Sequence, residues 1–394
     1  MTDPTQPPFV VHSARKVDAD GLVDDFWFAT DGGSIVATGT GTGWRELADG
    51  RDVVDAAGHW LTPGFIDLHG HGGGGHAFDA GPAAAASALA AHRSHGTTRS
   101  VLSLVARPAD ELAENLSLIA DLTERDPLVL GSHLEGPFLS RNRKGAHDPA
   151  FLRDPDVALV DEFIGAARGT LQQITIAPEL PNAFESIPVL TEAGVTVAVG
   201  HTEADYATAA RAFNIGARLL THAFNAMSGI GGRTPGPVVA AFDNDQVVLE
   251  LILDGIHVDP RVAHLMFEVA PRRIGLITDA MAAACSVDGD YRLGGLDVTV
   301  SGGRAVLKGT DTIAGSTLTQ DTALRLAVTV VGVAPQRAVE ALTATPARVL
   351  GLEHSLGRLK TGYAADAVLL DHGWQVRHVW ADGRGVARAA ESGV

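Results

Sequence analysis

Two histidines spaced to bind one metal ion follow the first long apolar run of the chain. Residues 67–71 read Asp-Leu-His-Gly-His, directly after Leu-Thr-Pro-Gly-Phe-Ile. Side chains of an extended strand alternate between its faces, so His69 and His71 would point the same way and offer two imidazole nitrogens to one ion. Because His-x-His also occurs in strands that bind nothing, the pair needs support from elsewhere in the sequence.

Acidic and histidine residues at the ends of later apolar runs supply that support. They are Glu135 in His-Leu-Glu-Gly-Pro-Phe, His201 in Val-Gly-His-Thr, His222 in Thr-His-Ala-Phe-Asn-Ala-Met and Asp279 in Leu-Ile-Thr-Asp-Ala-Met. Four imidazoles and a carboxylate suit a divalent ion such as Zn²⁺ or Fe²⁺, and the two oxygens of Glu135 could bridge two ions. Such an ion lowers the pKa of bound water to about 7, which makes hydroxide available at neutral pH.

Asp279 is the candidate for proton transfer. A carboxylate that faces an activated water can accept its proton and then deliver it to a leaving amine. Two less active roles also fit the sequence: Asp279 could cap the following segment or bind the metal structurally.

The elements that would position these residues alternate along the chain. Apolar runs predict strands at 61–69, 98–105, 128–134, 174–177, 195–199, 218–221, 247–253 and 274–278. Amphipathic segments predict helices at 83–95, 109–125, 155–167, 183–193, 203–213 and 260–269. This alternation predicts an α/β fold, a (β/α)₈ TIM-like barrel, in which catalytic groups come from the C-terminal ends of the strands.

Both ends of the chain have a different pattern, with short alternating segments and turns rich in Gly and Asp. We expect residues 1–60 and 350–394 to form one small β-sandwich domain of antiparallel strands, since chain ends often lie close together. The catalytic barrel would then span 61–349. Within it, 291–307 predicts an inserted hairpin, followed by helices at 317–331 and 335–350.

Composition excludes several classes of protein. The formal net charge of −17 over 394 residues argues against nonspecific binding to nucleic acid or to an anionic membrane. No apolar run approaches the roughly 20 residues of a membrane-spanning helix, and the N-terminus lacks the pattern of a secretory signal. The single cysteine, Cys285, excludes an intrachain disulfide. We therefore expect a cytoplasmic protein.

Eight segments of the chain, taken in order, resemble a known family. They are Pro-Gly-Phe-Ile-Asp-Leu-His-Gly-His, His-Leu-Glu-Gly-Pro-Phe-Leu, Lys-Gly-Ala-His, Ala-Pro-Glu, Gly-His-Thr, Thr-His-Ala-Phe-Asn-Ala-Met, Asp-Gly-Ile-His-Val and Thr-Asp-Ala-Met. From about Leu61 to Asp371 the chain is similar to the N-acetylglucosamine-6-phosphate deacetylases of the amidohydrolase superfamily. The resemblance implies metal-dependent hydrolysis of the acetamide of N-acetylglucosamine 6-phosphate, in amino-sugar catabolism and recycling.

The resemblance also implies roles for single residues. Glu135, His201 and His222 match metal ligands found throughout the family, whereas His69 and His71 match a pair that completes a second site and is missing in some members. One or two ions per subunit are therefore expected, Zn²⁺ before Fe²⁺ or another divalent metal. Asp279 matches the general base and acid.

Further matches concern the substrate and a partner subunit. His147 matches a residue that contacts the acetamido group, and Arg233 matches an arginine that reaches the active site of the neighbouring subunit in a homodimer. The other positions that match substrate contacts are Ala146, Asn225, Ala226, His257, Ile313, Ala314 and Gly315. Ala223 departs from the family pattern, which has a larger apolar residue there, and this could loosen the wall of the pocket.

The sequence also permits different substrates, and purely structural or solvent-exposed roles for several residues. The substrate could be the galactosamine epimer or a cyclic amide, and a noncatalytic relative could use the barrel as a scaffold, although a scaffold has no need of the six convergent residues. His76 fits a mobile loop, Cys285 a buried inert thiol, and Arg141, Arg143 and Lys144 fit solvated loop charges. Glu179 could cap a helix or support the site.

Overall fold

The computed structural model describes residues 7–388 and divides the chain into two compact units. One comprises the chain up to Ile66, His92–Arg99, and everything from Gln320 onward, and the other comprises Asp67–Ala91 and Ser100–Thr319. Residues 1–6 and 389–394, which belong to the predicted terminal domain, lie outside the described residues. The helices after Gln320 thus group with the terminal strands, whereas the sequence assigned them to the barrel.

A parallel sheet of eight strands confirms the predicted barrel. In sequence order its strands are β6 (Phe65–Asp67), β9 (Thr97–Val105), β10 (Val129–Glu135), β11 (Leu171–Ile176), β12 (Thr196–Val199), β13 (Leu219–Leu220), β14 (Val248–Ile252) and β15 (Ile274–Ile277). Each strand pairs with its sequence neighbour, and a parallel bridge from Gly70 to Ala280 brings the first and last strands together. The barrel is therefore nearly closed, and all its strand ends meet at one mouth.

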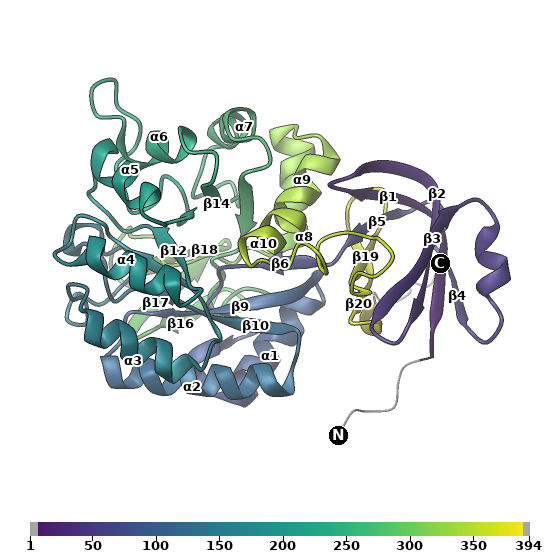
Figure 1. Cartoon of the computed structure of the whole chain (residues 1–394), viewed down its shortest axis with the longest axis horizontal. Coiled ribbons are helices and arrows are strands. Elements are labelled where there is room, and N and C mark those ends of the chain that lie inside the picture. The colour runs from purple at the N-terminus through teal and green to yellow at the C-terminus, as the bar shows by residue number, and fades with distance from the viewer. Residues whose placement is uncertain (1–6, 389–394) are drawn as a thin grey trace. The chain divides into compact units, whose positions relative to one another are not determined.

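Helices connect these strands and lie outside them (Figure 1). They are α1 (Pro82–Arg93), α2 (Ala109–Arg125), α3 (Val157–Ala167), α4 (Ala183–Glu192), α5 (Tyr206–Asn214), α6 (Gly236–Phe242) and α7 (Pro260–Val269). Asp156, Asp205 and Asp259 cap three of them by accepting a backbone N–H. The seven-residue α6 was not predicted.

Two predicted elements inside the catalytic region were wrong in detail. The run 61–69 is not one strand, because β5 (Trp60–Pro63) pairs with β19 (Ala367–Leu370) and β6 starts only at Phe65. Gly64 separates them, where an added Cβ would lie 2.2 Å from Thr98 Oγ1. The predicted hairpin at 291–307 is a three-stranded antiparallel sheet. Its strands are β16 (Gly289–Leu293), β17 (Leu296–Ser301) and β18 (Arg304–Leu307).

The last helices are also broken up. The segment 317–331 contains α8 (Gln320–Leu326) and a π-helical turn, η4 (Ala327–Val331), and 335–350 contains α9 (Pro335–Leu342) and α10 (Ala344–Val349). Thr343, with φ −134° and ψ −79°, interrupts the second pair. None of the helices within residues 7–388 is long and apolar enough to cross a membrane.

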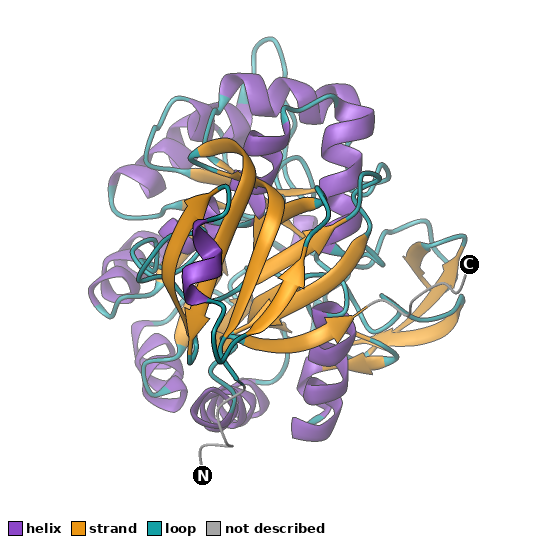
Figure 2. Cartoon of the chain, turned by 90° about the vertical axis from the view of Figure 1, so that its right-hand side faces the viewer, coloured by secondary structure: helices purple, strands orange, loops and turns teal. Residues whose placement is uncertain are grey.

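Strands from both ends of the chain form the second large sheet, shown in orange in Figure 2. It contains β1 (Phe9–Asp18), β2 (Gly21–Asp31), β3 (Ser34–Thr40), β4 (Asp52–Asp55), β5, β19, β20 (Val376–Ala381) and β21 (Arg384–Arg388). The expected small β domain is thus present as one mixed sheet, in which β1 runs parallel to β4 and β5. Phe28 and Leu61 are fully buried in its core.

Candidate active site

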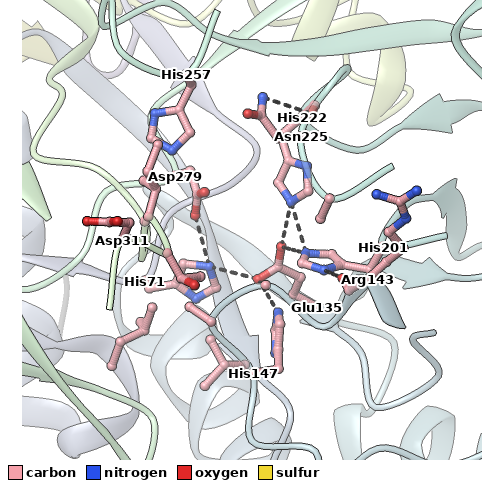
Figure 3. A pocket seen from close by; sticks show the side chains of 18 of the residues that line it. His71, Glu135, Arg143, His147, His201, His222, Asn225, His257, Asp279 and Asp311 are labelled. Atoms are coloured by element: carbon pink, nitrogen blue, oxygen red, sulfur yellow. Dashed lines mark hydrogen bonds and ion pairs between the residues drawn. The ribbon is translucent and has the colours of Figure 1, made fainter. Parts of the chain in front are cut away.

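The predicted ligands and Asp279 lie at or just beyond the carboxyl ends of barrel strands, and the fold brings them together at one mouth (Figure 3). His69 and His71 come after β6 and Glu135 is the last residue of β10, while His201, His222 and Asp279 each lie two residues beyond β12, β13 and β15. All six are at least nine-tenths buried. Sequence spacing could predict this convergence because parallel strands of a barrel end on the same side.

An unusual backbone conformation turns three of these side chains into the mouth. His201, His222 and Asp279 have φ angles of 46°, 25° and 47°, in the left-handed region that non-glycine residues seldom adopt. The backbone N–H of Asp279 donates to the carbonyl of His69 over 2.8 Å and so joins the first and last strands at the mouth. Conformations of this kind cost on the order of 1 kcal/mol each and cluster at functional sites.

Glu135 lies at the centre and contacts imidazoles with both oxygens. Its Oε1 lies 3.0 Å from His222 Nε2 and 3.1 Å from His201 Nε2. Its Oε2 lies 3.2 Å from the Nε2 atoms of both His71 and His147. Figure 3 shows Glu135 between these histidines. This is the arrangement that a carboxylate needs to bridge two ions.

Spacing between the ligand atoms fits divalent metal. Zn²⁺ binds imidazole nitrogen and carboxylate oxygen at about 2.0–2.2 Å, so tetrahedral ligand atoms lie about 3.3–3.6 Å apart. His201 Nε2 and His222 Nε2 are 3.1 Å apart, beside Glu135 Oε1. His69 Nε2 and His71 Nε2 are 3.3 Å apart, and Asp279 Oδ1 is 3.2 Å from the latter. Two buried groups among the described residues offer donors close enough for a metal ion. They are His69, His71 and Asp279, and Glu135, His147 and His201.

His147 also lies within this cluster, but its hydrogen bonds distinguish it from a ligand. The backbone N–H of Ala106 donates to His147 Nδ1 over 3.2 Å, so the neutral ring carries its proton on Nε2, the atom beside Glu135. Burial lowers the pKa of His147 to about 4, which keeps the ring neutral. His147 therefore presents an N–H donor to the mouth of the barrel, not a lone pair.

The acidic side chains strongly affect the ionisation of this cluster. Burial alone would lower the pKa of His71, but hydrogen bonds to Asp279 and Glu135 outweigh burial and raise it to about 9. Burial alone would raise the pKa of Asp279, but the hydrogen bond to His71 and the charge of His69 outweigh burial and lower it. Asp279 is therefore ionised at neutral pH and can accept a proton.

A cavity of about 410 Å³ opens above the cluster and contains most of the predicted substrate contacts. Its lining includes Ala146, His147, Asn225, Ala226, His257, Ile313 and Gly315. Two predicted contacts do not line it. Ala314 is fully buried in an apolar cluster, and Arg233 is exposed on the loop before α6. Ala223 is also fully buried and does not line the cavity, so a looser pocket wall at this position stays a prediction.

Sequence reasoning missed several residues of the site. Arg143, expected to be a solvated loop charge, is half-buried and lines the cavity, and its carbonyl lies 2.8 Å from His201 Nδ1. Asp311 lines the opposite part of the cavity from an exposed loop. Glu250 is fully buried beneath the cluster, and its Oε2 lies 3.2 Å from His69 Nδ1. The signal for Glu250 was a lone acidic residue in the apolar run 247–253.

The structure shows the surroundings of Cys285, His76 and Glu179. Cys285 is exposed, so the expectation of a buried thiol is wrong. His76 is exposed, but it belongs to β8 (His76–Ala77), which pairs with β7 (Gly72–Gly73), and not to an irregular loop. Glu179 accepts the backbone N–H of Glu203 over 2.6 Å and the hydroxyl of Thr202, next to His201, so it supports the loop that carries this histidine.

Comparison with known proteins gives the family. The profile described as "Amidohydrolase family" matches residues 60–386. An N-acetylgalactosamine-6-phosphate deacetylase of Escherichia coli O157:H7 is 38% identical and covers 95% of this chain and 98% of its own. An N-acetylglucosamine-6-phosphate deacetylase of Bos taurus is 36% identical, with 88% of both chains covered.

Solved structures agree with these sequence matches. A variant of the N-acetyl-D-glucosamine-6-phosphate deacetylase from Mycobacterium smegmatis, in complex with N-acetyl-D-glucosamine 6-phosphate, superimposes with a TM-score of 0.92. It is 40% identical, over 97% of this chain and 100% of that one. The chain therefore belongs to the amidohydrolase family, in which these relatives are deacetylases of N-acetylhexosamine 6-phosphates.

Proposed function

We propose that this protein hydrolyses the acetamide of N-acetylglucosamine 6-phosphate to acetate and glucosamine 6-phosphate, in amino-sugar catabolism and recycling in the cytoplasm. The observation that carries the proposal is the position of ionised Asp279 beside the imidazole cluster around Glu135, at the floor of a cavity of about 410 Å³. Relatives of both epimeric specificities support the general reaction, and the complex from Mycobacterium smegmatis supports the glucosamine substrate.

A divalent metal, with Zn²⁺ as the first candidate, completes this site in the proposal. Glu135, His201 and His222 would hold one ion, and His69 and His71, with Glu135 shared, would hold a second. When bound, such ions polarise a carbonyl oxygen and make water acidic enough to lose a proton at neutral pH.

The chain's own side chains would perform the proton transfers. Asp279 takes the proton of the attacking water while the new C–O bond forms, and then gives it to the amine nitrogen as the C–N bond breaks. His147 donates its Nε2–H to the carbonyl oxygen, on which negative charge grows. Its tautomer supports this role, because the bond from Ala106 leaves Nε2 as the protonated atom.

Phosphate recognition would come from the other wall of the cavity and from a second copy of the chain. Asn225, the backbone of Ala226 and His257 line that wall, and Arg233 would reach in from the partner of a homodimer. The exposure of Arg233, away from the cavity of its own chain, supports a role in trans. Ile230 and Ile256 support an interface nearby, because 49% and 41% of their surface is exposed, on this loop and next to His257.

The second candidate substrate is N-acetylgalactosamine 6-phosphate. The 38% identity to the Escherichia coli relative over 95% of the chain favours it. The test is acetate release by the metal-loaded protein from each epimer, with the Asp279→Asn variant as the control for contaminating activity. A higher kcat/KM for the glucosamine epimer is the expected result. The opposite ratio selects the galactosamine epimer, and no release from either contradicts both assignments.

A further inference from the structure

Glu250 is a carboxylate in the barrel core to which the proposed reaction gives no role. It lies in the middle of β14, between Leu249 and Leu251, and is fully buried. Moving a carboxylate out of water costs several kcal/mol unless hydrogen bonds and a nearby positive charge compensate it. A residue of this kind in an otherwise apolar strand therefore requires a reason.

The partners of Glu250 connect it to both halves of the histidine cluster. Its Oε2 lies 3.2 Å from His69 Nδ1 and accepts the backbone N–H of His222 over 3.3 Å. Its Oε1 accepts from Gln173 Nε2 over 2.8 Å. Among the residues that the structure describes, His69 is its ion-pair partner, and no lysine or arginine lies within ion-pair distance of it. His69 is therefore the group that lies between Glu250 and the rest of the ligand cluster.

The bond to Glu250 determines which nitrogen of His69 is free. A carboxylate can only accept, so His69 donates from Nδ1 and keeps the lone pair on Nε2. That Nε2 atom lies 3.3 Å from His71 Nε2 and 3.4 Å from Glu135 Oε1. A carboxylate that accepts from the outer nitrogen of a metal-binding histidine orients the ring and makes it a more basic ligand. Glu250 is placed to do this for His69.

The other imidazoles of the cluster have weaker support at Nδ1. His201 contacts a neutral carbonyl, that of Arg143, and within residues 7–388 the Nδ1 atoms of His71 and His222 have no hydrogen-bond partner. His69 is thus the ligand candidate whose outer nitrogen meets a charged group. A carboxylate here would act mainly on the ion bound by His69 and His71.

We propose that Glu250 is a positioning residue that holds His69 in its metal-binding tautomer and, through its negative charge, raises the affinity of the second metal site. The inference rests on the metal centre of the proposed function. Through the His222 backbone, Glu250 also fixes the distance between the two halves of the cluster, so its main effect on the first ion is geometric.

Glu250→Gln tests this proposal with little disturbance of the core. Gln173 Oε1 is buried without a hydrogen-bond partner, so the Gln173 amide can rotate by half a turn. Its oxygen then accepts from the NH₂ group introduced at position 250, and the carbonyl oxygen introduced there still faces His69. Charge is removed and shape is kept. Asp67→Asn is the matched control, because Asp67 is a buried carboxylate that accepts the backbone N–H of His69 over 3.2 Å and hydrogen-bonds Thr278.

The measurement is the number and affinity of Zn²⁺ ions, by competition with a chelator and elemental analysis of the full chain. Because Glu250→Gln removes the charge but keeps an acceptor at His69 Nδ1, we expect it to weaken binding of the second ion by about 10-fold, the lower end of the usual effect of changing such a partner. The first ion of Glu250→Gln, and both ions of Asp67→Asn, should bind as tightly as in wild type. Equal affinities in Glu250→Gln and wild type, an equal loss in Asp67→Asn, or a wild type that binds one ion only would overturn the proposal.

A second measurement applies even where Glu250→Gln does not fold. In wild type loaded with Zn²⁺ and containing ¹⁵N-labelled histidine, NMR should show His69 protonated on Nδ1 and bonded to metal through Nε2. Protonation on Nε2 would overturn the proposal. Neither measurement depends on turnover, so an inactive wild type that still binds two ions would contradict the deacetylase assignment and leave the role of Glu250 intact.

Discussion

Asp279 and His71 face each other across the mouth of the barrel, with Asp279 Oδ1 3.2 Å from His71 Nε2. This contact joins the end of the last strand to the loop after the first, and it keeps Asp279 ionised despite burial. It also leaves two roles open for Asp279, because an oxygen at this distance can serve either as a proton acceptor or as an additional metal ligand.

Asp279→Asn separates the two roles. An amide of the same size cannot accept a proton from water, so we expect kcat to fall by about 10²- to 10⁴-fold while the metal content stays near that of wild type. Acetate release and elemental analysis of the same preparation are the measurements. Loss of a metal ion would identify Asp279 as a structural ligand, and unchanged kcat would remove it from the proton transfer.

The barrel and its ligand positions were predictable because each depends on a local pattern. His201 and His222 come within two residues of the ends of short apolar runs, and in a parallel barrel that spacing is enough to place them at the common mouth. The division at Gly64 was not predictable in this way. The run 61–69 is mostly apolar on both sides of Gly64, and the pairing of Leu61 with Leu369, far along the chain, assigns its first half to another sheet.

Residues on loops account for most of what the sequence could not predict. Asp311 and Arg143 reach the same cavity from distant segments, and neither has a periodic or positional signal. Glu250 is different, because an acidic residue is almost never fully buried without a partner. Its presence in an apolar strand was a signal for a second polar layer beneath the ligands.

His147 offers a test of oxyanion stabilisation. Replacing it with leucine removes the Nε2–H donor, and we expect kcat to fall by about 10²- to 10³-fold with little change in KM, as for other donors to a developing oxyanion. His147→Gln keeps an N–H group near the same place and is the matched variant, so it should retain more activity than leucine does. Equal loss in both variants, with normal melting temperatures, would argue against donation by His147.

Arg233 can be tested for action across a dimer. Arg233→Ala should raise KM for the phosphorylated substrate far more than for unphosphorylated N-acetylglucosamine, because a guanidinium binds phosphate oxygens in pairs. Arg261→Ala is the control, since the Arg261 side chain is 93% exposed on α7 and contacts Asp259 only, among the ion pairs described.

Mixing Asp279→Asn with Arg233→Ala, which should both be nearly inactive at substrate concentrations near the wild-type KM, then identifies the subunit that supplies Arg233. Asp279→Asn brings an intact Arg233, and Arg233→Ala brings an intact Asp279, so each mixed dimer regains one complete site if Arg233 acts in trans. After unfolding and refolding in equal amounts, roughly a quarter of the wild-type activity should return at substrate concentrations near the wild-type KM. No recovery, in a mixture shown to contain mixed dimers, would place Arg233 in the site of its own chain.

His257 should make substrate binding depend on pH. Its Nδ1 lies 2.7 Å from Asp254 Oδ2, and Asp254 Oδ1 also accepts the backbone N–H groups of Ile256 and His257. Burial alone would lower the pKa of His257, but the hydrogen bond and charge of Asp254, aided by the charge of Asp279, outweigh burial and raise it above 6.5. Figure 3 shows His257 on the Asp279 side of the cavity.

A raised pKa means that the imidazolium charge is present at low pH and is lost as pH rises through the folded-state value, which lies above 6.5. KM for the phosphorylated substrate should therefore increase at alkaline pH, while KM for unphosphorylated N-acetylglucosamine should not follow the same curve. Asp254→Asn removes the group that raises the pKa, so the increase in KM should begin at lower pH. His257→Gln should abolish the increase in KM. The second ionisation of the substrate phosphate, near pH 6, affects wild type, Asp254→Asn and His257→Gln alike. An alkaline increase in KM that stays at the same pH in Asp254→Asn would show that another group is titrating.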